Sequence, residues 1–210
     1  MKIRIIVTFI LVPLLFGSCK QGTQKNQATQ VAEPQPVDWE GLKIKGTDIA
    51  TTSFFALSGK LKAALEQGGV PNALEYCKIS AYPLIDSLSE LHHATIRRTS
   101  LKLRNSNNAP SPRESAVLKQ FESSFGLSLE VEPFVEDLGE AGVNYYGPIW
   151  VQNNCLQCHG VVGETLTTAN NDLIRTLYPN DTATGYSEGD FRGMWVVNFE
   201  KGYSPNTIKQ

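Results

Sequence analysis

Apolar residues recur every three or four positions from Asp48 onward, a spacing typical of an amphipathic helix. The stripe that this spacing creates consists of Phe54, Leu57, Leu61 and Leu65. Asp48 can cap the first turn of this helix, and Gly68-Gly69 can end it. We therefore expect a helix over residues 48–68.

A second helix is expected shortly after the two glycines. Pro71 suits the first turn of a helix that carries Leu74 and Cys77. Pro83 can kink or end this helix, because proline has no N–H for an intrahelical hydrogen bond. The apolar pattern then resumes over residues 84–91.

Strands are expected mainly in the second half of the chain. All but the first follow a third helix, which begins at Ser111 and Glu114 with the spacing of a capping box. The apolar face of that helix consists of Val117, Leu118 and Phe121. The segments with strand composition are 96–103, 129–135, 143–151 and 194–199, and a short helix is expected over 171–177. This order predicts an α+β fold with an antiparallel sheet.

The N-terminal region has the pattern of an export signal. Lys2 and Arg4 precede an apolar run from Ile5 to Phe16, which is shorter than the roughly 20 residues of a membrane-spanning helix. Gly17-Ser18-Cys19 ends the run and resembles a bacterial lipobox, in which the cysteine carries the lipid. An ordinary signal peptide or an uncleaved anchor is the alternative.

These features divide the chain into three parts. Residues 1–18 are predicted to be a lipoprotein signal peptide, and residues 19–37 a disordered tether from a lipidated Cys19. Residues 38–210 are long enough to form one domain with its own core. Lys20 favours sorting to the outer membrane, so we expect an exported protein that is lipid-anchored there and faces the periplasm.

The charge of the chain bears on its partners. Lys and Arg number 19 and Asp and Glu number 21, which gives a net charge of −2, and no basic stripe is evident. A nucleic-acid partner is therefore not expected.

The most specific chemistry lies in Cys155-Leu156-Gln157-Cys158-His159, which has the spacing of a covalent haem attachment site. Two thiols at this spacing can add to both vinyl groups on one haem edge, and the following histidine can bind the iron. A structural disulfide would not need His159, a thioredoxin-type pair needs a βαβ unit, and a zinc site needs a fourth ligand. One covalent haem c is therefore predicted at Cys155 and Cys158, with His159 on the iron.

Cys77 is left over, because the lipid anchor and the haem motif use the other three cysteines. It could supply a thiolate to the second face of the iron. It lies on an amphipathic helix, however, where a free cysteine is also commonly a small buried hydrophobe. The residues alone leave both interpretations open. The rival iron ligands are Met194, His92 and His93.

Several stretches, in this order, resemble a family of bacterial c-type haem proteins with a PAS-like fold. They are Glu75-Tyr76-Cys77-Lys78, Ile96 to Asn105 with Asn108-Ala109-Pro110, Cys155 to Gly160, and Gly185 to Gly193. The resemblance covers about residues 45–200. It implies a PAS-like antiparallel sheet flanked by helices, and one haem with His159 and Cys77 as axial ligands. Ser106 stands where the family pattern has proline, which alters loop stiffness but no haem ligand.

Other residues could contact the haem around its edge. Haem propionates are often bound by arginine, and the alternative for any one arginine is a solvated surface charge. The candidate propionate contacts are Arg97, Arg98, Arg104 and Arg192. The aromatic segment before the motif could pack against the haem or form plain core. Its members are Tyr145, Tyr146, Pro148 and Trp150.

Iron held from both sides by protein ligands has no free position for substrate and can change oxidation state with little rearrangement. The expected function is therefore that of a membrane-anchored, exported, monohaem c-type cytochrome-like protein. It would act in electron transfer with an unknown redox partner, or in redox sensing. The alternatives are a haem-based sensor of gases or other ligands, and a haem peroxidase-like enzyme with a displaceable distal ligand. The signalling role of fused family members is not carried over, since no sensor transmembrane or kinase segment is evident.

Overall fold

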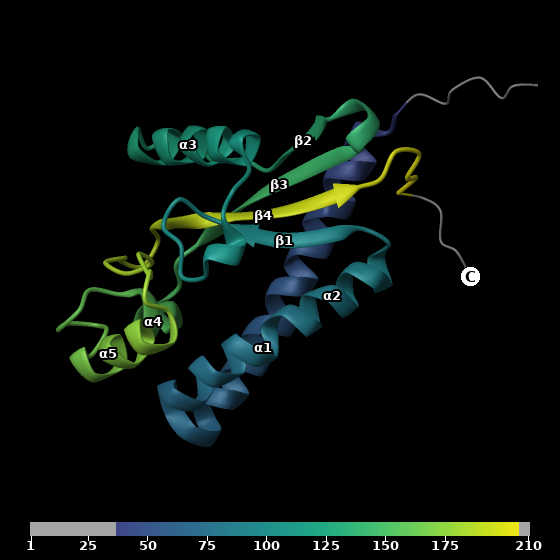
Figure 1. Ribbon diagram of the computed structural model, residues 1–210. Coiled ribbons are helices and arrows are strands. Elements are labelled where there is room, and N and C mark those ends of the chain that lie inside the picture. Colours follow the sequence, from purple (N-terminus) through teal and green to yellow (C-terminus); the bar gives the residue numbers. More distant parts are fainter. Residues whose placement is uncertain (1–36, 206–210) are drawn as a thin grey trace, which may run out of the picture. The chain divides into compact units, whose positions relative to one another are not determined.

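The structure is a computed structural model and describes residues 37–205. A four-stranded antiparallel sheet of order β1-β4-β3-β2 lies between helices (Figure 1). The strands are β1 (Thr95–Thr99), β2 (Phe134–Asp137), β3 (Val143–Trp150) and β4 (Phe191–Phe199). The α-helices are α1 (Trp39–Ile79), α2 (Ala81–His92), α3 (Pro112–Gly126), α4 (Leu156–His159) and α5 (Thr168–Leu177). The short 3-10 helices are η1 (Ser106–Asn108), η2 (Gly139–Ala141) and η3 (Asn153–Cys155).

This architecture confirms the predicted α+β class with an antiparallel sheet. The PAS-like assignment within that class stays a prediction. The predicted signal peptide, Cys19 and nearly all of the tether lie outside the described residues.

The start of α1 differs from the prediction. The helix begins at Trp39, and the cap is Asp38, whose carboxylate accepts a hydrogen bond from the Gly41 N–H at 2.8 Å. Asp48 instead lies within the helix and pairs with Lys45 at 3.5 Å. The apolar pattern did not reveal the first turns, because the cap at Asp38 lies in a polar context before the regular stripe begins.

Gly68 and Gly69 have non-helical backbone angles and interrupt α1 at the predicted helix end, so α1 consists of two helical segments that meet at a kink. Gly69 has φ 65° and ψ −159°, a backbone conformation essentially restricted to glycine. The Asn72 side-chain amide donates to the Ala64 carbonyl at 2.8 Å and joins the two halves across the bend. Pro71 lies in the first turn after it, as predicted. The bend sets the direction of residues 70–79, the shorter segment of α1, which carries Cys77.

The two faces of the sheet have separate cores. α1 and α2 cover one face and α3 covers the other (Figure 1). Residues of the first core include Ile49, Leu57, Ile85, Ile96, Tyr145, Trp195 and Val197. The second core consists of Val117, Leu118, Phe121, Tyr146, Met194 and Val196. Neighbouring strand residues such as Tyr145 and Tyr146 therefore face opposite cores, as the pleat requires.

A third, smaller cluster holds α4 and α5 beyond the end of the sheet, beside the second half of α1 (Figure 1). Its buried members are Val70, Leu74, Leu166 and Ile174. Cys158 packs against this cluster from α4. The cluster thus fixes the short helix that ends in His159 against the helix that carries Cys77.

Several boundaries differ from the sequence prediction. Pro83 lies in the first turn of α2, and the break between α1 and α2 is at Ser80, because proline is tolerated only in a first turn. β1 ends at Thr99 rather than Leu103, and β4 begins at Phe191 rather than Met194. The segment 129–133 is not a strand, and β2 begins at Phe134.

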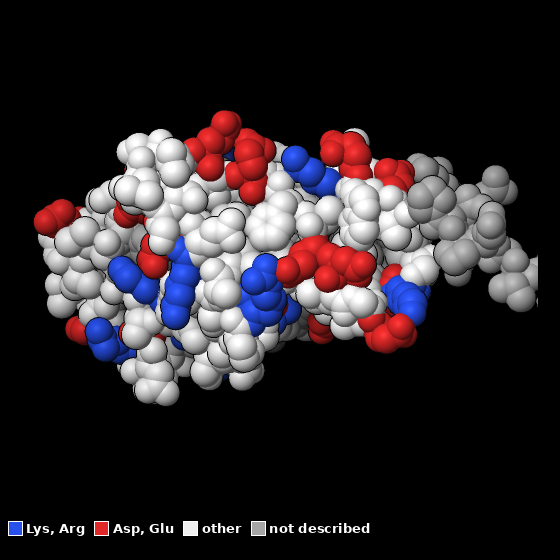
Figure 2. Space-filling view, turned by 90° about the horizontal axis from the view of Figure 1, so that it is seen from above, with Lys and Arg blue, Asp and Glu red and all other residues white. Residues whose placement is uncertain are grey.

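The surface of the described part carries mixed charge. Figure 2, seen from the side of α3, shows acidic and basic side chains interspersed over this face. Between residues 37 and 205, no helix has both the length and the apolar composition needed to cross a membrane.

Candidate functional site

The two motif cysteines and His159 lie on consecutive short turns. Cys155 ends η3, and Cys158 and His159 belong to α4, which is a single helical turn. Cys155, Cys158 and Cys77 are all free, half-buried thiols. Burial raises the pKa of the Cys158 thiol to about 11, against a smaller opposing effect of Arg104.

The hydrogen bonds of His159 define which ring nitrogen is free. Its Nδ1 lies 2.6 Å from the Ala183 carbonyl oxygen and 3.3 Å from Arg104 Nη2. The Ala183 carbonyl oxygen can only accept, so this shorter contact requires a proton on Nδ1, and the longer contact with Arg104, which can only donate, then adds no hydrogen bond to the ring. Burial lowers the pKa of His159 well below 6.5, with Arg192 and Arg104 adding to the effect. The neutral ring therefore keeps a lone pair on Nε2, the form in which histidine binds metals.

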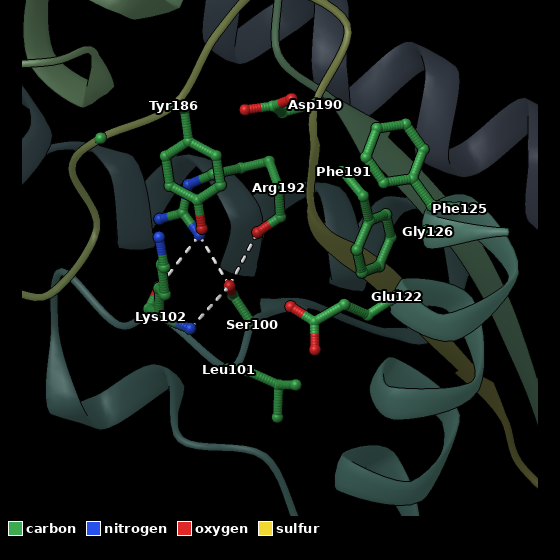
Figure 3. A pocket seen from close by; sticks show the side chains of 11 residues that line it. Ser100, Leu101, Lys102, Glu122, Phe125, Gly126, Tyr186, Asp190, Phe191 and Arg192 are labelled. Carbon is green, nitrogen blue, oxygen red and sulfur yellow. Dashed lines mark hydrogen bonds between the residues drawn. The ribbon is translucent and has the colours of Figure 1, made fainter. Parts of the chain in front are cut away.

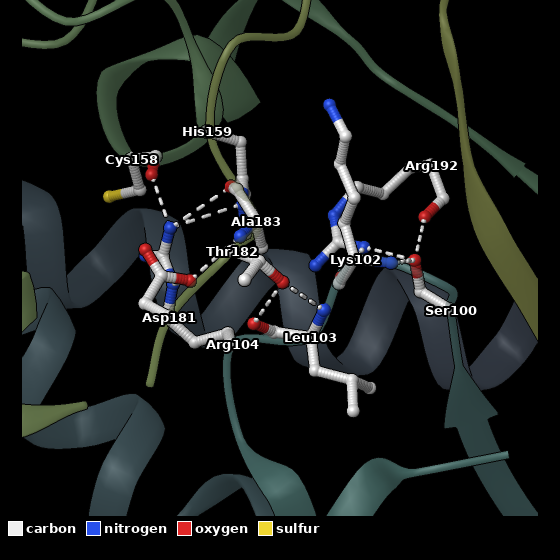
Figure 4. A network of polar contacts seen from close by, with 10 residues as sticks. All are labelled: Ser100, Lys102, Leu103, Arg104, Cys158, His159, Asp181, Thr182, Ala183 and Arg192. Atoms are coloured by element: carbon white, nitrogen blue, oxygen red, sulfur yellow. Dashed lines mark hydrogen bonds and ion pairs between the residues drawn. The ribbon is translucent and has the colours of Figure 1, made fainter. Parts of the chain in front are cut away.

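Arg104 holds this arrangement in place (Figure 4). Its guanidinium donates to Asp181 Oδ1 at 3.0 Å, to the Cys158 carbonyl at 2.6 Å and to the Ala183 carbonyl at 3.2 Å. Asp181 Oδ1 also accepts from the Ala183 N–H at 2.9 Å. The side chains of Arg104 and Asp181 are only 13% and 2% exposed. One buried ion pair thus connects the haem-type motif to the loop that orients His159.

Tyr186 lies on the other side of His159. The centroids of the two rings are 6.4 Å apart in an edge-on arrangement. The Arg192 guanidinium lies 5.3 Å from the Tyr186 ring and donates to Ser100 Oγ at 2.7 Å and to the Lys102 carbonyl at 3.0 Å. These residues line a cavity of about 290 Å³ that extends toward α3 (Figure 3).

Cys77 faces the motif from α1. It follows by three residues Leu74, a member of the cluster against which Cys158 packs. The Cys77 thiol lies close enough to Cys158 to contribute to the raised pKa of the Cys158 thiol. Burial raises the pKa of Cys77, and the nearby guanidinium groups of Arg98 and Arg104 lower it. Cys77, Cys158 and His159 are therefore brought to one site from distant parts of the sequence.

A model of the Tll0287-like family matches residues 20–199, which is most of the chain. The chain belongs to the Tll0287-like family. This confirms the family resemblance expected from the sequence, although His159 and Cys77 themselves are not tested by the match. The solved structure of the "cyanobacterial heme-protein Tll0287" is 27% identical, with a TM-score of 0.48. The alignment covers 68% of this chain and 94% of that one. The comparison with curated proteins finds no match.

Two candidates for haem packing lie away from Cys77. Tyr146 is fully buried in the α3-side core, stacked on Phe134 and hydrogen-bonded to Asn144. Trp150 packs on Phe125 of α3. These contacts support the plain-core alternative for Tyr146, and a haem contact of either ring stays a prediction.

The four candidate arginines have different surroundings. Arg97 donates to both carboxylate oxygens of Glu114 at 2.7 Å and to the Ala109 carbonyl at 2.8 Å, which ties β1 to α3. Arg104 and Arg192 have the partners described above. The Arg98 side chain has no hydrogen-bond or carboxylate partner among residues 37–205, and its guanidinium lies over the Trp195 ring.

The rival iron ligands have other environments. Met194 is fully buried in the α3-side core, on the face of the sheet away from α1. His92 is the last residue of α2, a helix of 12 residues whose first residue, Ala81, is the end nearer to Cys77 in the chain. Burial lowers the pKa of His92, with Lys45 adding to the effect.

The alternative uses of the motif can be compared with the fold. The described sheet is antiparallel throughout, so it offers no βαβ unit for a thioredoxin-type site. Within residues 37–205, no group of three or more His, Cys, Asp or Glu could hold a metal ion unaided. Cys155 and Cys158 are free rather than joined.

The sequence alone did not identify Asp181 and Ala183 as parts of the site. Their roles depend on contacts with Arg104, 77 residues away from Asp181 in sequence. The one usable signal was that Arg104 and Tyr186 both lie in family-like runs that flank the motif.

Proposed function

We propose that this chain is a monohaem c-type protein with haem bound to the thiols of Cys155 and Cys158. His159 and Cys77 would bind its iron. The observation that carries this proposal is the hydrogen-bonded Nδ1–H of His159, which leaves Nε2 free at a site shared by the free thiols of Cys158 and Cys77. The protein that gives the Tll0287-like family its name is described as a "heme-protein", and membership of that family supports the choice of cofactor.

The residues present suit such a group. The two thiols of the motif can form thioethers, and a buried carbonyl partner for Nδ1–H is the usual device that fixes a metal-binding histidine. When bound, haem would supply a one-electron Fe(III)/Fe(II) couple. Cys77 lies on the segment of α1 that follows the Gly69 bend. It would supply a thiolate that favours Fe(III).

The role we infer is electron transfer or redox sensing on the outer side of a bacterial membrane. Two protein ligands, each on a helix anchored by an apolar cluster, leave the iron no position for substrate. Sensing of a gas or catalysis of a peroxidase type requires Cys77 to leave the iron. Absence of a spectral change with CO, in both oxidation states, would favour the carrier role over these two.

We also infer that the chain is exported and tethered through a lipid on Cys19, since c-type haem is attached outside the cytoplasmic membrane in bacteria. The lipobox-like end of the apolar run supports this inference. In a Cys19→Ala variant, the domain should move from the membrane to the soluble exported fraction. Intact mass of the native chain without a lipid would contradict the tether.

Haem attachment is tested with Cys155→Ala combined with Cys158→Ala, against Cys77→Ala as a control that keeps both motif thiols. After acid-acetone extraction, the control should retain haem on the polypeptide and the double variant should retain none. Covalent haem in the double variant would refute the proposed attachment.

A further inference from the structure

Arg98 is a half-buried cation on β1. It lies on β1 two residues after the buried Ile96, and therefore faces α1 and α2. Its guanidinium lies 5.6 Å from the centroid of the Trp195 ring, its partner across the strands. Burial lowers the pKa of Arg98, and Cys77 and Tyr82 nearby raise it.

Arg98 differs from the other three candidate arginines in having unused donors within the described part of the chain. Arg97 is paired with Glu114, and Arg104 is paired with Asp181. Arg192 donates to a hydroxyl and a carbonyl oxygen. A half-buried guanidinium without a protein hydrogen-bond partner loses part of its hydration, which has a free-energy cost. A ligand that brings a negative charge would remove this cost.

A cavity of about 220 Å³ opens in front of this guanidinium. Tyr82 from α2 and Asn108 from η1 border it, and the Tyr82 hydroxyl donates to Asn108 Oδ1 at 3.1 Å. Asp86, whose side chain is exposed, lies at the rim. Ala81, which follows Cys77 by four residues across the break at Ser80, also lines the cavity.

We propose that this cavity is a carboxylate-binding site whose anchoring cation is Arg98, and that it takes a propionate of the haem. The inference rests on the proposed function and selects one arginine of four. A planar guanidinium with free donors matches a carboxylate in a bidentate manner. The position beside Cys77 places the site at the edge of the proposed haem, whereas the other three arginines hold protein partners.

The test compares the haem-loaded full chain with Arg98→Gln and Arg98→Lys. Arg175→Gln, an exposed arginine on α5, serves as the matched control. Resonance Raman spectroscopy reports the propionate bending band directly. Arg98→Gln should shift this band, Arg98→Lys should shift it less because a point charge remains, and Arg175→Gln should leave it unchanged. Arg98→Gln should also lower the reduction potential, because removing a nearby cation favours Fe(III).

The outcomes separate this inference from the proposed function. If the native chain carries no covalent haem, the proposed function fails first. If haem is covalently bound and the propionate band is the same in both Arg98 variants, the inference is wrong. If the Arg98 variants change only the spectroscopic signature of the thiolate, Arg98 acts on Cys77 rather than on a propionate, and the inference is also overturned. If acetate raises the melting temperature of the haem-loaded chain only when Arg98 is present, the cavity takes free carboxylates rather than a propionate, and the inference is likewise overturned.

Discussion

Replacing Arg104 with leucine should destabilise the domain strongly. The substitution leaves the Asp181 carboxylate, 2% exposed, without its cationic partner. Removing one member of a buried ion pair typically costs about 3–5 kcal/mol, because the remaining charge is buried and unpaired. For a domain of this size, that corresponds to a fall in melting temperature of roughly 6–20 °C.

The double variant Arg104→Leu with Asp181→Leu separates the charge effect from lost hydrogen bonds. It removes both charges, so its loss of unfolding free energy should be smaller than that of Arg104→Leu alone. The Cys158 and Ala183 carbonyls still lose a donor, at about 1 kcal/mol each, so recovery should be partial. Urea unfolding of the full chain measures all of these values. A loss below about 1 kcal/mol for Arg104→Leu would refute the structural role of the pair.

Three further predictions follow from the fold and the site. Gly69→Ala should lower the free energy of unfolding, measured in urea, by about 1–3 kcal/mol. The control Gly59→Ala, in open helical surroundings, should not lower it. Equal effects would show that the backbone conformation at residue 69 does not require glycine. Because burial lowers the pKa of His92 below 6.5, the unfolded state takes up the proton first, so stability should fall as the pH drops through 6.5. His92→Gln should weaken this dependence in melting curves recorded from about pH 7 to about pH 5, and an unchanged dependence would contradict the assignment. Cys77→Ala should remove the thiolate signature from the ferric spectrum, whereas Met194→Leu, a change in the core, should leave it intact. The reverse pattern would make Met194, and not Cys77, the iron ligand.

Local patterns predicted the elements whose signals are short-range. The capping box at Ser111 and Glu114 marks the start of α3, and both of its hydrogen bonds are present. Pro71 and the glycine pair marked the end of one helical segment and the start of the next, which meet at the kink in α1. The strand predicted over 129–135 starts too early, because Leu129 remains exposed and residues 129–133 pair with no strand.

The reactive groups of the site could be predicted from the sequence, but the residues that hold them in place could not. The spacing of the motif pointed to His159 from the sequence, because the chemistry lies within five consecutive residues. The Ala183 carbonyl, which fixes the ring, is an ordinary backbone group and carries no sequence signal. Likewise, Arg97, Arg98 and Arg104 differ in their hydrogen-bond and ion-pair partners, which come close to them only in the folded chain.

The most direct test of the central proposal is the ferric absorption and electron spin resonance spectrum of the purified, haem-loaded full chain. A six-coordinate, low-spin ferric haem with a thiolate ligand signature, lost in Cys77→Ala, is the predicted result. A high-spin spectrum, or a low-spin spectrum that Cys77→Ala leaves unchanged, would show that Cys77 and His159 do not hold one haem between them.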